Sequence, residues 1–282
     1  MSAPPGFPVF VDGALLPPGA GAISTDDQGF QLGLAVFDTL LYEDGCRYFE
    51  DEHLARLEQG ARALAIPWPP PWDVRAALAL YCRELGPRAA TLRITLTRGV
   101  PGGRPSLVVG ARAIVRPPDP GVVVVLERDA KRAGDALESV KSTSRVRNVL
   151  AREAAQRAGA FEALLCTDEG DVVEGTISYV FAVLAGALVT PPVERGALAG
   201  IMRGVLLAEA AAAGLAPRVE RLEVADLARA SEILLSNTSG RVIPVVEVRA
   251  VRSGLPGAQG AVCRLLRAWV AACEARYRAG RA

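Results

Sequence analysis

The chain has 282 residues, of which half are hydrophobic, and its 32 basic residues nearly balance its 31 acidic ones. This length is sufficient for one large domain or two medium ones, each with its own hydrophobic core. The formal net charge of +1 and the lack of a basic run argue against nucleic acid or an anionic membrane surface as a partner. We therefore expect neither nucleic acid nor a membrane as a partner.

The five cysteines are odd in number, widely spaced and contain no Cys-x-x-Cys pair, which is typical of reduced thiols. No run of the sequence reaches the roughly 18 apolar residues that a membrane span needs, and the first residues lack the pattern of a signal peptide. These features predict a soluble protein in the cytoplasm.

The first third of the chain is predicted to be an α+β domain. Its expected elements are a hairpin over 9–16, strands over 36–42, 91–97 and 106–115, and helices over 51–65 and 74–85. The run RPPDPG at 116–121 is too rich in proline for a helix or a central strand. We predict that it links two domains, 1–118 and 119–282.

The second domain is predicted to mix short strands with separated helices. The expected strands are 122–126, 163–167, 178–184, 219–222, 233–236 and 242–248, and the expected helices are 148–158, 201–213 and 262–277. This pattern favours an α+β or barrel-like domain over a doubly wound parallel sheet.

Only two lysines, Lys131 and Lys141, accompany a large excess of arginine. Imine chemistry needs an amine that can lose its proton, which arginine cannot provide. Lys131 lies in RDAKRAGD, which predicts a charged turn. Lys141 follows a valine and precedes small hydroxyl residues ahead of a helix, so it is the better catalytic candidate, with a surface lysine as the alternative.

Residues 139–206 resemble the central signature of the class IV (fold-type IV) aminotransferases, and the resemblance extends from Phe10 to Val248. In that family, the lysine ahead of the Asn-Val-Leu-Ala helix forms a Schiff base with pyridoxal 5'-phosphate, which corresponds to Lys141. The glutamate of the Glu-Gly-Thr-x-Ser segment pairs with the pyridine nitrogen, which corresponds to Glu174; without the family, Glu174 would be interpreted as a solvated turn residue.

The resemblance also implies a fold, with a small N-terminal α/β sandwich-like domain and a larger, mixed barrel-like C-terminal domain that carries the Schiff-base lysine. Its chemistry is coherent. A carboxylate at the pyridine nitrogen keeps the ring protonated, so that the ring can accept the electrons of the substrate's Cα–H bond. The lysine, once released, can move that proton.

Three further segments resemble the family's phosphate-binding groups. Arg56 in HLARL corresponds to an arginine that grips the cofactor phosphate. The run LAGIMR implies that the amides of Ile201 and Met202 face the phosphate at a helix start. Thr238 and Ser239 would add further donors, and an ordinary turn is the alternative interpretation of these two residues.

Other cofactors and mechanisms are disfavoured by the sequence. His53 is the only histidine, which excludes a histidine-based triad and argues against zinc, so we expect no metal and assign His53 to packing. No glycine-rich segment matches a nucleotide fingerprint such as Gly-x-Gly-x-x-Gly.

The reaction within the family is left open. Branched-chain aminotransferases carry a tyrosine where this chain has Val146, and the trap histidine of D-amino-acid aminotransferases is missing from TRGVPGGRPS. Thr39, the Gly-Gly-Arg at 102–104, Arg145 and Asn237 resemble 4-amino-4-deoxychorismate lyase, which releases pyruvate and 4-aminobenzoate. We favour this lyase, with a transaminase of branched-chain or D-amino acids using 2-oxoglutarate as the alternative and a non-catalytic member as a remote one.

The candidate substrate residues are Arg98, Arg104 and Arg145, any of which could bind carboxylates, and Thr39, whose hydroxyl could assist proton movement. Tyr179 replaces the asparagine that the family usually has after Glu-Gly-Thr-x-Ser, and it either reshapes the pocket or packs in the core. The resemblance alone implies a homodimer.

Overall fold

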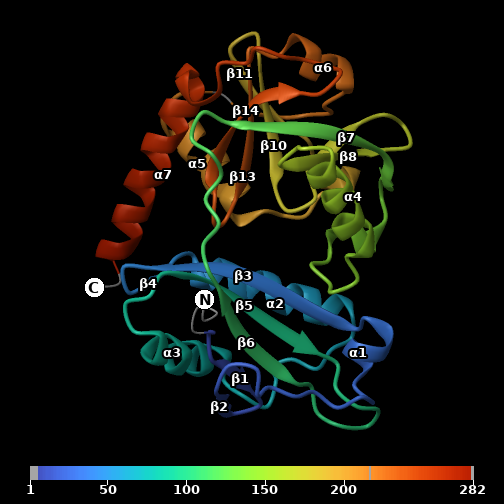
Figure 1. The fold of residues 1–282 in the computed structure, drawn as a ribbon, viewed down its shortest axis with the longest axis vertical. Coiled ribbons are helices and arrows are strands. Elements are labelled where there is room, and N and C mark those ends of the chain that lie inside the picture. The colour runs from blue at the N-terminus through green and yellow to red at the C-terminus, as the bar shows by residue number, and fades with distance from the viewer. Residues whose placement is uncertain (1–5, 216, 281–282) are drawn as a thin grey trace. The chain divides into compact units, whose positions relative to one another are not determined.

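The computed structural model describes residues 6–215 and 217–280, which form two compact units (Figure 1). The first unit extends to Ile114 and includes Val140–Ser144, and the second comprises Val115–Ser139 and Arg145–Gly280. Each unit has its own sheet and core. The predicted two-part α+β fold is confirmed. No helix in these ranges is long and apolar enough to cross a membrane.

The first unit contains an antiparallel six-stranded sheet in the order β2-β1-β6-β5-β3-β4. Its strands are β1 (Val9–Val11), β2 (Ala14–Leu16), β3 (Ala35–Glu43), β4 (Cys46–Arg47), β5 (Ala90–Thr97) and β6 (Leu107–Arg112). The Asp12-Gly13 turn has positive φ at both residues, the conformation of the tight hairpin turn that Asp-Gly predicts.

Helices cover one face of this sheet. They are α2 (Glu50–Ala63) and α3 (Val74–Leu85), and a short α1 (Gln28–Leu32) precedes β3. Buried side chains such as Leu40, Leu57, Leu78 and Ile94 form the core between the helices and the sheet. Because side chains alternate along a strand, the odd-numbered residues of β3 face the other side of the sheet.

The second unit contains a mixed eight-stranded sheet in the order β12-β11-β10-β13-β14-β7-β8-β9. Its strands are β7 (Val122–Lys131), β8 (Glu162–Thr167), β9 (Val172–Gly175), β10 (Tyr179–Leu184), β11 (Ala187–Thr190), β12 (Arg218–Val219), β13 (Glu232–Asn237) and β14 (Arg241–Val248). Strand β7 runs parallel to both β14 and β8.

Four α-helices and three short 3₁₀ turns accompany this sheet. They are α4 (Val146–Arg157), α5 (Ile201–Ala212), α6 (Val224–Arg229), α7 (Ala261–Ala279), η1 (Ala136–Ser139), η2 (Val193–Arg195) and η3 (Gly257–Gln259). Helix α4 packs small alanines against β7 and β8, which permits a close approach. Helices α5 and α7 pack on each other and on β13 (Figure 1).

The surroundings of the two lysines differ from the sequence-based expectation. Lys131 is the last residue of β7 and is only 1% exposed, because β7 continues to pair with β8 as far as Thr167 and two carboxylates contact the ammonium. Lys141 packs with the first unit instead of the predicted 119–282 domain. The reason is a pair of main-chain hydrogen bonds that join residues 141 and 143 to β3.

Candidate active site

Lys141 is held beside the start of β3 by its main chain. The Phe37 N–H donates to the Lys141 carbonyl oxygen at 2.9 Å, and the Thr143 N–H donates to the Ala35 carbonyl oxygen at 2.9 Å. The Lys141 Nζ atom lies 4.7 Å from the centroid of the Phe37 ring, within the range of a cation–π contact. The amine is therefore placed on an aromatic surface, with its backbone fixed to the sheet.

Arg93 contacts the same aromatic ring and was missed by the sequence interpretation. Its guanidinium carbon lies 3.6 Å from the Phe37 centroid, and its Nε–H donates to Thr95 Oγ1 at 3.2 Å. Arg93 is also the cross-strand partner of Thr39. The alternation in TLRITLT could have indicated this position, because it places Arg93 on the face opposite the buried Leu92 and Ile94.

The charge of Arg93 has no carboxylate partner among the described residues. Burial, together with the nearby charge of Arg112, lowers the pKa of the Arg93 guanidinium to about 10. A partly buried cation without a counter-ion favours an incoming anion. A substrate carboxylate is such an anion, and the fork of an arginine can bind it with two hydrogen bonds.

The three arginines predicted for the substrate lie on two segments. Arg98 directly follows β5, and its N–H donates to the Leu34 carbonyl oxygen at 3.0 Å. Arg104 is exposed in the β5–β6 loop, where its carbonyl oxygen lies so near Gly99 that any larger residue at position 99 would collide with it. Arg145 belongs to the second unit and precedes α4.

Arg56 forms a two-pronged ion pair with Asp38, whose side chain is fully buried. Nε and Nη2 of Arg56 donate to the two carboxylate oxygens of Asp38, each at 2.7 Å. His53 contacts the same carboxylate through Nδ1 at 2.7 Å. Burial alone would raise the pKa of Asp38, yet the charge of Arg56 and the hydrogen bonds from Arg56 and His53 hold it well below its usual range.

This cluster has consequences for both basic residues. Burial lowers the pKa of His53, which therefore packs as a neutral ring with its Nδ1 directed at Asp38. The edge of Arg56 that carries Nε is committed to Asp38. A phosphate contact by Arg56 would therefore use the other N–H groups of its two Nη atoms.

Glu174 is a buried residue of β9, only 3% exposed, and not a solvated turn residue. Its Oε1 atom lies 2.7 Å from Lys131 Nζ, and its Oε2 atom accepts the Leu198 N–H at 3.0 Å. Glu162 fixes the loop after it by accepting the Ile177 N–H at 3.2 Å and the Ser178 hydroxyl at 2.9 Å. The carboxylate of Glu174 is thus rigidly oriented.

The start of α5 leaves its first amides without a side-chain partner in the described chain. Gly200 precedes Ile201 and Met202, and a Cβ atom at position 200 would lie 2.2 Å from the ring of Tyr179. Tyr179 is buried, so the tyrosine that replaces the family's asparagine packs against this glycine. The unpaired N–H groups of a helix start attract anions such as phosphate.

The start of α7 shows the opposite arrangement. The carboxylate of Glu232 accepts the N–H groups of Val262 and Cys263, each at 2.9 Å, so this helix start is already occupied by an acid of the protein itself. In α5 no equivalent acid is present among the described residues, which is consistent with an anionic ligand.

Thr238 and Ser239 lie in the tight connection between β13 and β14. Asn237 organises this connection by accepting the Gly240 N–H at 2.6 Å and the Ser239 hydroxyl at 3.3 Å. The hydroxyl of Ser236, one residue earlier, is buried without a hydrogen-bonding partner in the described part of the chain. The hairpin therefore has polar groups that no hydrogen bond among the described residues uses.

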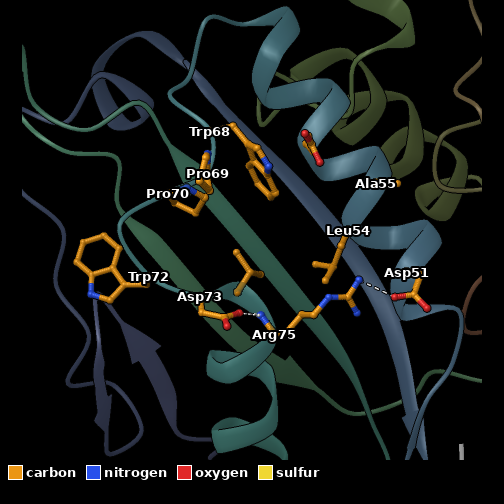
Figure 2. Close-up of a pocket in the computed structure, with 11 residues that line it drawn as sticks. Asp51, Leu54, Ala55, Trp68, Pro69, Pro70, Trp72, Asp73 and Arg75 are labelled. Atoms are coloured by element: carbon orange, nitrogen blue, oxygen red, sulfur yellow. Dashed lines mark hydrogen bonds and ion pairs between the residues drawn. The ribbon is translucent and has the colours of Figure 1, made fainter.

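A separate pocket of about 530 Å³ lies in the first unit between α2, α3 and the proline-rich loop that joins them (Figure 2). Trp68, Trp72 and Leu54 line it, and Arg75 pairs with Asp51 at its rim at 2.6 Å. None of the candidate site residues lines this pocket. Its walls contain no amine or hydroxyl suited to the predicted chemistry.

The described residues thus include the kinds of group that a phosphate-bearing pyridine cofactor requires: a lysine amine in the first unit, and in the second a buried carboxylate and a helix start that lacks an acid. No group of three or more His, Cys, Asp or Glu side chains among the described residues could hold a metal ion. All five cysteines are free thiols.

Comparisons with known proteins agree with this class of enzyme. The family model for class IV amino-transferases matches residues 35–248, and the chain belongs to this family. It is 31% identical to a candidate branched-chain-amino-acid aminotransferase of Methanocaldococcus jannaschii over 85% of this chain and 87% of that one. It is also 31% identical to a bifunctional aminodeoxychorismate lyase and D-amino acid transaminase of Mycobacterium tuberculosis, over 78% and 83% of the two chains.

A solved structure also shows the similarity to aminotransferases. The pyridoxal-phosphate-bound form of a hypothetical aminotransferase from Mycobacterium tuberculosis superposes with a TM-score of 0.84 at 28% identity, covering 94% of this chain and 98% of that one. Enzymes of class IV use pyridoxal phosphate, and the protein is an enzyme of this class.

Proposed function

We propose that this enzyme is 4-amino-4-deoxychorismate lyase-like and releases pyruvate and 4-aminobenzoate. The observation that carries the proposal is the row formed by Phe37, Thr39 and Arg93 on two paired strands, with the Lys141 amine on the Phe37 ring. This row combines an aromatic surface, a hydroxyl and a cation that has no carboxylate partner within the described ranges, which suits a ring-shaped substrate that carries carboxylates. The relative from Mycobacterium tuberculosis is named in part as an aminodeoxychorismate lyase, which supports the proposal.

The cofactor roles follow the family pattern. Bound pyridoxal phosphate supplies an electron sink for the bond that breaks at the substrate. In this proposal Lys141 binds the cofactor and then moves the substrate proton through Nζ, and Glu174 holds the pyridine nitrogen protonated. Arg56 through its Nη atoms, the amides of Ile201 and Met202, and Thr238 and Ser239 would hold the phosphate.

The substrate roles extend the sequence-based list by one residue. Arg93 binds a substrate carboxylate because its charge is half-buried and lacks a carboxylate partner in the described residues. Arg98, Arg104 and Arg145 are further candidates for a second carboxylate. The Thr39 hydroxyl, opposite Arg93 across β3 and β5, assists proton movement.

The second candidate is a transaminase of branched-chain or D-amino acids that uses 2-oxoglutarate. Both relatives support it, since one is a candidate branched-chain aminotransferase and the other is named in part as a D-amino acid transaminase. The two reactions share the cofactor residues and differ in whether the amino group stays on the cofactor. That difference makes them separable by experiment.

The decisive experiment supplies aminodeoxychorismate to the holoenzyme without any keto acid. A lyase releases pyruvate and 4-aminobenzoate over many turnovers, because its cofactor returns to the starting form. A transaminase of branched-chain or D-amino acids, given one of these amino acids instead, stops after one turnover until 2-oxoglutarate is added, since the amino group has moved to the cofactor. Strict dependence on 2-oxoglutarate, with no pyruvate, would assign the enzyme to the transaminases.

We also propose that the enzyme acts as a cytoplasmic homodimer, as the family resemblance implies. Light scattering of the purified holoenzyme should give twice the mass of one chain. A monomeric mass would reject the dimer while leaving the cofactor roles intact.

A further inference from the structure

We infer that Lys131 is a positioning residue for Glu174 and that it sets how strongly this carboxylate holds the cofactor's pyridine ring. The inference rests on the proposed role of Glu174 and adds a residue that the sequence interpretation had assigned to a charged turn. The Lys131 ammonium lies 2.7 Å from Glu174 Oε1 and 2.7 Å from Glu138 Oε2. It is therefore held between two carboxylates.

The strand register explains this placement. Lys131 ends β7 opposite Thr167 of β8, and Glu174 of β9 lies opposite Leu165 of β8. The lysine and the glutamate are thus on strands that flank β8. Glu138 approaches from η1, and the backbone turn at Gly196, whose φ is +97°, passes close to that segment. The ammonium is thus contacted by carboxylates of β9 and η1.

Because both side chains are buried, Glu174 depends on Lys131 as a partner. The side chains of Lys131 and Glu174 are 1% and 3% exposed, so water does not replace a lost partner. A buried charge without a partner is strongly unfavourable. Lys131 occupies Oε1 and the Leu198 N–H occupies Oε2, which fixes the plane of the carboxylate and leaves its remaining lone pairs in defined directions.

Without Lys131, Glu138 and Glu174 would be left on either side of an unoccupied cation position. Two neighbouring carboxylates repel each other, so at least one of them would move from its present position. The carboxylate proposed to meet the pyridine nitrogen would then lose its orientation. If Lys131 acts through Glu174, the effects of changing the two residues on cofactor binding are not independent.

The test is a double-mutant cycle with Lys131→Gln, Glu174→Gln and the double variant, with two readouts: the dissociation constant of pyridoxal phosphate added to the apoprotein and the position of its visible absorption band. Lys131→Gln should raise the dissociation constant about tenfold and shift the band. In the Glu174→Gln background the same change should raise the dissociation constant by less than about twofold. A coupling of this size lies within the range seen for contacting residues. Lys131→Arg, which retains the charge, should restore most of the affinity.

Arg221→Gln is the matched control, because it removes a 2.8 Å ion pair to the buried Asp171 in the same unit. It should lower thermal stability and leave both cofactor readouts unchanged. If Lys131→Gln does not fold, as judged by thermal unfolding of the apoprotein, the same cycle is measured with Lys131→Arg, whose smaller effect should likewise vanish in the Glu174→Gln background.

Two outcomes would overturn the inference: wild-type affinity and absorption in folded Lys131→Gln, or effects of Lys131 and Glu174 that simply multiply. Neither outcome would affect the proposed function. That proposal fails separately, if the unaltered protein does not take up pyridoxal phosphate or if Lys141→Ala retains the visible band.

Discussion

Replacing Asp38 by asparagine tests whether the buried cluster around Arg56 stabilises the first unit. Asp38 accepts two hydrogen bonds from Arg56 and one from His53, all at 2.7 Å, and its side chain is fully buried. Asparagine removes the charge and directs its own N–H donors at Arg56 or His53, which are themselves donors. Breaking one side of a buried ion pair costs about 3–5 kcal/mol, so we expect the free energy of unfolding to fall by that amount.

The assay is urea unfolding followed by tryptophan fluorescence, which reports mainly on the first unit because Trp68 and Trp72 both lie in it. Asp51→Asn is the control, since Asp51 lies on α2, the helix that carries Arg56, and forms an exposed pair with Arg75. Surface pairs contribute about 0–1 kcal/mol. Equal losses for the Asp38 and Asp51 variants would refute the reasoning.

The pH dependence provides a second check on Asp38. Its pKa in the folded protein is depressed below the ordinary value of 3.8. Its contribution to stability is therefore complete above that value and is lost as the pH falls below it. The difference between wild type and Asp38→Asn should be constant above about pH 5 and should shrink in stronger acid. A difference that already declines between pH 7 and 5 would contradict the assignment.

Three further changes have defined outcomes. Lys141→Ala should abolish the visible cofactor band and lower turnover by about 100-fold or more; a variant that retains both would end its assignment. Gly200→Ala should push the Tyr179 ring aside and cost about 1–3 kcal/mol in urea unfolding, whereas unchanged stability would show that the ring moves freely. His53→Asn should flatten the loss of stability below pH 6.5, because the depressed pKa of buried His53 lets only the unfolded state gain its proton; an unchanged slope would reject this.

Local sequence patterns predicted most of the fold. The hairpin over 9–16, helices α2 and α3, and the long helix α7 all follow from turn residues and helical spacing, and the structure confirms them. The short elements α1, β4, β9, β11 and α6 were missed. Each has six residues or fewer, so its periodicity is too brief to register, and each depends on pairing or capping partners.

The site was only partly predictable because its arrangement depends on strand register. The family motif marked Lys141 and Glu174, but it could not reveal that Lys131 ends a buried strand, since RDAKRAGD has the composition of a turn. Arg93 was overlooked for a related reason. The alternation of residues in TLRITLT indicates which face of the strand Arg93 lies on. Its pairing with Thr39 and its contact with Phe37 follow from a strand register that a single sequence does not specify.

The uncapped start of α5 implies a trade-off between the stability of the apoprotein and ligand binding. An acid placed there, as Glu232 is at α7, would stabilise the helix by about 0.5–2 kcal/mol, but it would occupy the amides that an anion needs and would repel the anion. The chain instead has Gly200 at this position, with Tyr179 filling the space beside it. The apoprotein is therefore less stable than it would be with an acid at this position. Binding of the ligand raises the free energy of unfolding, and the increase grows with the ratio of ligand concentration to dissociation constant. The melting temperature of this enzyme should therefore report cofactor occupancy, and screens for more heat-stable apoprotein should select acidic substitutions at this helix start that weaken the holoenzyme.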